Sequence, residues 1–236
     1  MPYVSWIADE DFKSVTATLI QSFEDAQKKN FERNVIDPFT LLFEMSLFQL
    51  SGDAWKETEK HRQAQKALTN AVGNFHQKLL GKVAGWQDLG TKHQVDLLNT
   101  QRRIIAEVKN KFNTLNAGGF VKLYNTLDSL VSEKASVFKG YTSYYVEIIP
   151  ENGALFNECF TPSNSSTGTK CSENPLVRRI DGISFYALVT GVDDALKQMF
   201  MALPRVICDI KPDYRLSSEN WSFVENFFSR AFSESQ

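Results

Sequence analysis

The feature that most constrains the fold is a pair of short apolar runs in the middle of the chain, joined by a polar turn. Val95–Leu98 and Ile104–Val108 are rich in branched residues and too short for helices, and Asn99–Arg102 separates them. This pattern predicts a β-hairpin. Side chains alternate along a strand, so Glu107 and Lys109 should share one face of the second strand.

The same hairpin supplies a second acid. A turn centred on residues 100 and 101 would place Asp96 opposite Ile105 and diagonal to Glu107, at roughly 7 Å between side-chain bases. Mg²⁺ is usually held by one or two carboxylates with water and substrate phosphate. Asp96 and Glu107 are therefore candidate Mg²⁺ ligands, and Lys109 is a candidate to orient a water and stabilise developing negative charge in phosphodiester hydrolysis. A solvated hairpin without catalytic function fits the same three residues.

The spacing Asp96-x10-Glu107-Val-Lys109 resembles the active-site motif of the PD-(D/E)XK nuclease superfamily, with Val95 where proline is usual. The run Glu107-Val-Lys-Asn-Lys-Phe-Asn-Thr114 is more specific, because it is similar to type II restriction endonucleases that cut GGNCC or GGWCC sites. The similarity includes 37–39, 62–77 and 178–186, and spans most of the chain from about residue 35 to 205.

That resemblance implies a Mg²⁺-dependent, homodimeric endonuclease that cuts double-stranded DNA at a short palindrome within a restriction-modification system. It also implies an α/β fold with a central mixed β-sheet flanked by helices, together with additional N- and C-terminal helices.

Length and composition favour one large domain. The chain has 236 residues, of which 42% are hydrophobic and 12% aromatic, and no Pro/Gly/Ser-rich linker divides it. We expect a single nuclease domain over 1–236, with an N-terminal helical region (1–55), a catalytic core (56–150) and a specificity loop with C-terminal helices (151–236). In the core, the expected order is helix, strand, strand, strand, helix, strand.

Apolar periodicity and caps place the other elements. Helices are expected at 9–29, 39–50, 55–80, 120–138, 192–203 and 221–232, with a strand at 142–149 and a loop at 161–169. Asp37 and Pro38 form the start signal for the second of these helices.

Several classes of protein are disfavoured. The N-terminus has early acids and no long apolar run, which argues against a signal peptide or membrane span and favours a cytoplasmic protein. Three cysteines without C-x-x-C spacing indicate neither a disulfide framework nor a zinc site. The chain lacks the glycine-rich motifs of nucleotide-binding loops, so no nucleotide cofactor is expected.

The charge distribution favours a local phosphate-binding face, although the net charge is only −2. Residues 61–140 carry 12 Lys and Arg against 5 Asp and Glu, whereas both flanking segments carry more acids than bases. The basic residues near the hairpin include Arg102, Arg103, Lys111 and Lys122. A chance excess of basic side chains on a solvent-exposed surface, without phosphate binding, would give the same counts.

Three further residues are weaker candidates for the metal site or catalysis. Glu44 is the one acid in an apolar helix, where a surface ion pair explains it equally well, and Glu59 lies on the helix that precedes the hairpin. His76 could serve the site, although a lone helix histidine is more often structural.

Donors suited to DNA lie in two further regions. Arg178 and Arg179 could contact guanine, the commonest specific base contact of arginine, while Asp181 could accept from cytosine or cap a helix at Gly182. The complete set of candidate DNA-binding residues is Arg178, Arg179, Asp181, Lys111, Asn113, Lys122, Gln63 and Asn70.

Two other functions fit the same residues. A DNA repair or recombination nuclease with this core would also need metal but would select DNA structure rather than sequence. A DNA-binding module without catalysis requires that the carboxylates be ordinary surface groups.

Overall fold

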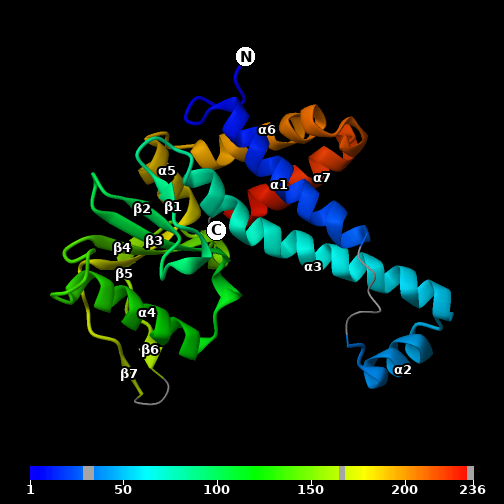
Figure 1. Ribbon diagram of the computed structural model, residues 1–236, viewed down its shortest axis with the longest axis horizontal. Coiled ribbons are helices and arrows are strands. Elements are labelled where there is room, and N and C mark those ends of the chain that lie inside the picture. The colour runs from blue at the N-terminus through cyan, green and yellow to red at the C-terminus, as the bar shows by residue number, and fades with distance from the viewer. Residues whose placement is uncertain (29–34, 165–167, 233–236) are drawn as a thin grey trace.

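The computed structural model describes residues 1–28, 35–164 and 168–232 (Figure 1). A six-stranded sheet of order β1-β2-β3-β4-β8-β5 lies at its centre, and β6 pairs with β7 in a separate ribbon. The β3–β4 and β4–β8 pairs are parallel and the outer pairs are antiparallel. The strands are β1 (Gln87–Asp88), β2 (Leu97–Asn99), β3 (Ile104–Lys111), β4 (Thr142–Ile149), β5 (Asn157–Cys159), β6 (Ser163–Asn164), β7 (Thr169–Lys170) and β8 (Val177–Asp181).

Helices cover both faces of this sheet. They are α1 (Asp9–Lys28), α2 (Pro38–Leu47), α3 (Gly52–Leu80), α4 (Ala117–Ser132), α5 (Gly182–Thr190), α6 (Ala195–Ile210) and α7 (Ser218–Phe232). Short 3-10 turns lie at η2 (Gly90–Lys92), η3 (Phe112–Thr114), η4 (Glu151–Gly153) and η5 (Pro212–Tyr214). The fold is thus mixed α/β, as expected.

The two sheet faces bury different sets of side chains. A large core joins α1, α3, α5 and α6 to Ala106, Val108 and Val146 of the sheet. A smaller core, here called the α4 core, joins α4 to Ile105 and Tyr145 on the opposite face. Alternation along β3 and β4 therefore sends successive residues into different cores.

Local signals account for several element boundaries. Asp37 caps α2 by accepting from the Phe39 amide (3.0 Å), and Pro38 occupies the first helical position.

Most of the elements expected from the sequence are present in the structure. The expected helices are confirmed with shifted ends, and the strand expected at 142–149 is confirmed as β4 with the same ends. The helix expected over 120–138 instead runs over 117–132, and 134–140 forms turns. β8 was not expected as a strand. The division into 1–55, 56–150 and 151–236 stays a prediction.

Gly182 lets α5 begin directly against the centre of the sheet. A Cβ atom added there would lie 2.2 Å from the Ile148 carbonyl oxygen, a distance that no side chain permits. The absence of a Cβ therefore fixes the junction of β8 and α5 against β4.

Membrane-spanning helices and disulfide bonds can be examined in the structure. No helix in the described parts of the chain is both long and apolar enough to cross a bilayer. Cys159, Cys171 and Cys208 are all free.

Candidate active site

Strand β3 presents Glu107 and Lys109 on the face covered by α4. Their neighbours Ala106 and Val108 point into the large core, whereas Ile105 points into the α4 core. The Lys109 ammonium nitrogen lies 2.5 Å from a Glu107 carboxylate oxygen, and the two side chains are 25% and 16% exposed. This ion pair is thus mostly shielded but open to a ligand from one side.

The chain entering β2 brings Asp96 to this pair. The Asp96 Oδ2 atom accepts a hydrogen bond from the Val108 amide (2.8 Å), and the Asp96 amide donates to the Ala106 carbonyl (2.9 Å). Both contacts anchor Asp96 to the backbone of β3, directly beside Glu107. Asp96, Glu107 and Lys109 are therefore brought together.

The expected hairpin register was wrong by two residues. Leu97 pairs with Ala106, because residues 100–103 all belong to the turn. Asn99 stabilises this longer turn by accepting from the Arg102 amide (2.9 Å), and the next residue, Arg103, adopts a left-handed φ of 55°. A shift of two residues leaves every side chain on its expected face, so the carboxylates still converge.

Burial sets the electrostatics of the two acids. Burial, together with the neighbouring Asp96 charge, raises the pKa of Glu107 to about 6 against the opposing effect of Lys109. Burial also raises the pKa of Asp96, against the hydrogen bond from the Val108 amide and the Lys109 charge. Lys109 alone therefore does not compensate the two partly buried carboxylates, and an additional cation would stabilise their charged forms.

The donor set fits Mg²⁺. Among the described residues no group of three or more His, Cys, Asp or Glu side chains gathers as a metal cluster, so this site offers two carboxylates. Two carboxylates leave coordination positions for water and phosphate oxygen, which is the usual environment of Mg²⁺ at phosphate-processing sites. Asp96 and Glu107 are the residues that would hold the ion.

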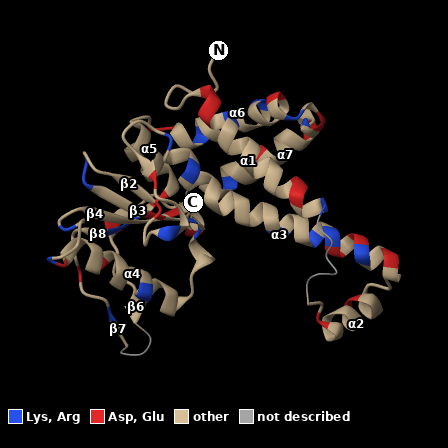
Figure 2. Cartoon of the chain, viewed as in Figure 1, with Lys and Arg blue, Asp and Glu red and all other residues tan. Residues whose placement is uncertain are grey.

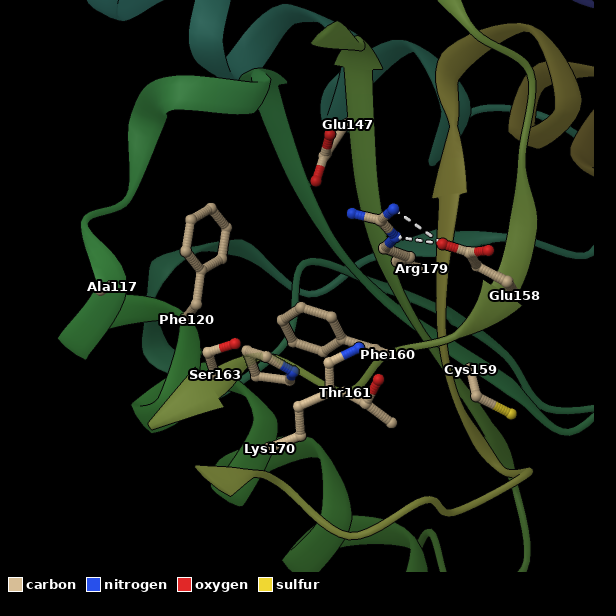
Figure 3. Close-up of a pocket in the computed structure, with 11 residues that line it drawn as sticks. Ala117, Phe120, Glu147, Glu158, Cys159, Phe160, Thr161, Ser163, Lys170 and Arg179 are labelled. Atoms are coloured by element: carbon tan, nitrogen blue, oxygen red, sulfur yellow. Dashed lines mark hydrogen bonds and ion pairs between the residues drawn. The ribbon is translucent and has the colours of Figure 1, made fainter. Parts of the chain in front are cut away.

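Neighbouring strands extend the same face into a pocket of about 420 Å³ (Figure 3). Across the sheet, Lys109 pairs with Glu147, while Glu107 pairs with Tyr145 and Tyr145 with Arg179. In Figure 3 the Glu147 carboxylate and the Arg179 guanidinium extend toward the same space. The pocket therefore lies beside the carboxylate site, on the same face of the sheet.

Glu147 is the residue of this face that the sequence analysis missed. It is buried, and burial raises the pKa of its carboxyl group, against the charge of Arg179. A signal was available: Glu147 is the single acid in the apolar run Tyr144–Ile149, and that run was expected to be a strand of the core.

The two candidate arginines lie on opposite sides of β8, since they are consecutive residues of a strand. Arg179 is on the pocket side and forms an ion pair with Glu158 (Nη2 to Oε1, 2.7 Å). The Arg178 guanidinium donates to the side chain and the backbone carbonyl of Asn157 (2.8 and 2.6 Å). Only Arg179 shares the face of Glu107 and Lys109.

The expectation that Asp181 contacts a base is wrong. Asp181 is fully buried, and its two carboxylate oxygens accept from the Ser184 amide (2.9 Å) and the Phe156 amide (2.8 Å). Its function is to cap α5 and to hold the chain before β5, which is the alternative that the sequence analysis left open.

The other candidate DNA-binding residues are dispersed over the fold. Lys111 and Asn113 are exposed at the end of β3 and in η3, Lys122 is exposed on α4 and Asn70 is exposed on α3. Gln63 donates to Glu59 (2.6 Å). Their contacts with DNA stay predictions.

Two of the basic residues do not belong to a common phosphate-binding face. Arg103 lies six residues before Lys109 along an extended strand, which corresponds to roughly 20 Å. The Arg102 guanidinium donates to the Leu188 carbonyl (2.5 Å) and that of Arg103 to the Lys139 carbonyl (2.9 Å). Both arginines anchor the hairpin turn.

Glu44 and Glu59 do not reach the carboxylate site. Glu59 precedes Leu80, the last residue of α3, by 21 positions, which corresponds to roughly 30 Å along the helix. Arg62 lies between the two acids, with its Nη2 2.8 Å from Glu44 and its Nη1 2.9 Å from Glu59. Their ion pairs join α2 to α3, so neither is a further metal ligand of this site.

His76 is a structural residue. Its Nδ1 lies 2.8 Å from the Tyr186 hydroxyl, and burial lowers the pKa of the imidazole to about 4. The ring is therefore neutral at physiological pH and joins α3 to α5 in the large core.

Comparison with known proteins gives the family. Residues 4–211 match the family described as Eco47II restriction endonuclease. The chain belongs to this family. The type II restriction enzyme Eco47II of Escherichia coli is 50% identical over 228 residues, which cover 95% of each protein. The type II restriction enzyme Sau96I of Staphylococcus aureus is 32% identical over 216 residues, which cover 88% of this chain and 80% of the relative.

The present member of the Eco47II family is thus a type II restriction endonuclease, an enzyme that cleaves DNA at specific sites as part of a restriction system. The family match covers the carboxylate site and the pocket beside it, since the residues of both lie between 96 and 179.

Proposed function

We propose that this endonuclease is a PD-(D/E)XK enzyme that hydrolyses a phosphodiester bond in each strand of a GGNCC or GGWCC site, with Mg²⁺ held by Asp96 and Glu107. The observation that carries the proposal is the convergence of two partly buried carboxylates and one ammonium on a single sheet face. The enzyme would act as a homodimer, because a palindromic duplex presents the same half-site twice.

Each side chain has a defined task in this proposal. Mg²⁺ held by Asp96 and Glu107 would polarise the phosphodiester as a Lewis acid and lower the pKa of a water. Asp96 is oriented by the Val108 amide, and Glu107 holds the Lys109 ammonium 2.5 Å away. Lys109 then donates to the attacking water or to a phosphate oxygen and stabilises the negative charge that develops there.

Recognition of bases is assigned to the neighbouring pocket. Arg179 carries donors that suit guanine O6 and N7, and it lies on the face of the carboxylate site. Its ion pair with Glu158 is 42% and 55% exposed, so DNA can replace this partner at small cost. Lys122 is a proposed phosphate contact, because it is an exposed cation on α4, the helix that covers this face.

Digestion of unmethylated plasmid DNA with added Mg²⁺, with sequencing of the ends, tests the proposal. Asp96→Asn and Lys109→Ala should each abolish cleavage and retain DNA binding, because the lost interactions act mainly in the transition state. Glu10→Gln is the matched control, since this exposed acid lies at the start of α1. Cleavage by Asp96→Asn at the rate of the control would refute the assignment, and fragments without a defined sequence at their ends would refute the recognition site.

A further inference from the structure

Helix α2 is mostly apolar, yet it has no buried residue. One side carries the α2 stripe, defined as Phe39, Leu42, Phe43 and Leu47, whose exposures are 73%, 61%, 62% and 75%. These residues are spaced three and four apart, so they form a continuous surface that Phe48 (71% exposed) extends. The apolar stripe of a helix normally packs against a core or a partner, and here the stripe has no such cover within the single chain.

Polar contacts hold α2 in place and turn the stripe outward. On the side opposite the stripe, Glu44 accepts from the Trp55 indole nitrogen (2.8 Å) and pairs with Arg62 of α3. Figure 1 shows that α2 and the first half of α3 project away from the sheet as an arm. In Figure 2 almost all of α2 lacks charge, whereas the outer half of α3 is charged. Helix α2 is therefore attached to α3 through the side opposite the stripe.

A second unpartnered apolar surface lies on the same chain. A groove of about 750 Å³ runs between α1, α3, α6 and α7, and it is lined by residues such as Leu19, Val72, Leu203 and Val224. Helix α7 has no buried residue, and Phe227, which lines this groove, is 53% exposed. Figure 1 shows α3 between α2 and α7, so the arm does not cover the groove of its own chain.

We propose that the α2 stripe of one chain binds in the α1–α3–α6–α7 groove of a second copy, and that the second arm binds the first chain reciprocally. This inference rests on the proposed two-fold action on DNA and names the surface that produces the dimer. A two-fold contact covers both unpartnered surfaces of each chain at once, because stripe and groove are exchanged symmetrically.

The size of the surfaces agrees with this occupant. Helix α2 is 10 residues long, or about 15 Å, which suits a groove between helices. At about 200 Å² for each fully exposed aromatic side chain, Phe39, Phe43 and Phe48 alone present roughly 400 Å². Each partner contributes one stripe and one groove, so the buried surface reaches the roughly 800 Å² per partner typical of stable interfaces.

The groove is also continuous with the catalytic strand. Its lining includes Asn110, Lys111, Phe112 and Asn113, which follow Lys109 directly. A helix bound there would fix the end of β3 and thereby set the position of one carboxylate site relative to the other.

Sedimentation velocity tests the role of the stripe, both for free protein and for protein bound to a short cognate duplex without Mg²⁺. Phe43→Ser should weaken self-association at least tenfold. Val137→Ser should leave it unchanged, because Val137 is an equally isolated apolar residue (82% exposed) that lies outside both surfaces. Retention of the two-chain assembly by Phe43→Ser, with a circular dichroism spectrum like that of the wild type, would overturn the inference.

Crosslinking tests the groove independently. In a background with Cys159, Cys171 and Cys208 replaced by serine, chains with Phe43→Cys are mixed with chains with Phe227→Cys and oxidised. Disulfide-linked pairs should contain one chain of each kind. Pairs of two Phe43→Cys chains would show that stripe meets stripe, and they would refute the groove assignment.

Cleavage separates this inference from the proposed function. Wild-type protein that cuts plasmid with Mg²⁺ but sediments as one chain on its cognate duplex would refute the dimer surface and leave the carboxylate chemistry intact. A two-chain assembly that depends on Phe43 but does not cleave with Mg²⁺ would support the surface and refute the chemistry.

Discussion

Replacement of Glu107 by glutamine should abolish cleavage and, at neutral and higher pH, stabilise the folded protein. The reason is that burial and the Asp96 charge raise the pKa of Glu107 from 4.5 to about 6. A carboxyl group whose pKa is raised on folding favours the folded state below its unfolded pKa, and this contribution is lost as pH rises through the folded pKa. Glutamine keeps a similar shape without the charge.

The structure gives the magnitude. A shift of about 1.5 pKa units corresponds to about 2 kcal/mol, and Glu107 is only 16% exposed, so solvent screening reduces this value little. For a chain of 236 residues, a change of this size raises the melting temperature by roughly 4–8 °C. The expected gain for Glu107→Gln is full at about pH 8 and absent at about pH 4, where the wild-type carboxyl group is protonated in both states.

Thermal melting in chelator at these two pH values is the assay, with Glu10→Gln as the control for loss of an exposed acid. A second series with Mg²⁺ provides an internal check. Mg²⁺ should raise the melting temperature of the wild type and not that of Glu107→Gln, because binding to the folded state alone is stabilising. A melting temperature of Glu107→Gln no higher than that of the wild type at pH 8, or a gain that persists unchanged at pH 4, would refute the reasoning.

Three further outcomes are expected. Arg179→Ala should cost about 1–3 kcal/mol of binding on cognate DNA with little loss on random duplex, whereas Lys122→Ala should weaken both and lower the salt slope; equal losses for Arg179→Ala on both duplexes would contradict base reading. Asp181→Ala should lower the free energy of unfolding by about 2–3 kcal/mol in denaturant titrations, because two backbone amides lose their acceptor, and an unchanged midpoint would contradict this. Single-turnover cleavage should fall about tenfold per pH unit below about pH 6, where protonated Glu107 competes with metal, and a flat profile from pH 5 to 7 would contradict that role.

The catalytic hairpin was predictable because the information that defines it is local. Branched residues and a polar turn marked the strands, and period-two alternation placed Glu107 and Lys109 on one face whatever the register. The register itself was not predictable, since it depends on how Asn99 and Arg103 close a turn of four residues. A register error of two residues leaves each side chain on the same face of the sheet, so the predicted grouping of Asp96, Glu107 and Lys109 was still correct.

Residues whose role depends on distant parts of the chain were assigned less well. Asp181 preceded a helix signal and could equally have faced DNA, and only its burial against Phe156 decides for the cap. Glu59 shares a helix with residues near the sheet, but the length of that helix removes it from the site. Glu147 was marked locally as the single acid of an expected strand, but its position next to Lys109 depends on the register of β3 and β4, which the local pattern does not give.

The close contact of Gly182 with Ile148 determines how rigidly the carboxylate site is connected to the proposed base-contacting Arg179. Arg179, Tyr145 and Glu107 form one row across β8, β4 and β3, so Arg179 and Glu107 stand two strand spacings apart, or about 10 Å. The β8–α5 junction cannot slide along β4, because any movement toward it brings the Gly182 backbone against the Ile148 carbonyl. The sheet therefore fixes the offset between a base held by Arg179 and the phosphate that is cut, and mutations in strands β6 and β7 should change affinity without moving the cleavage position.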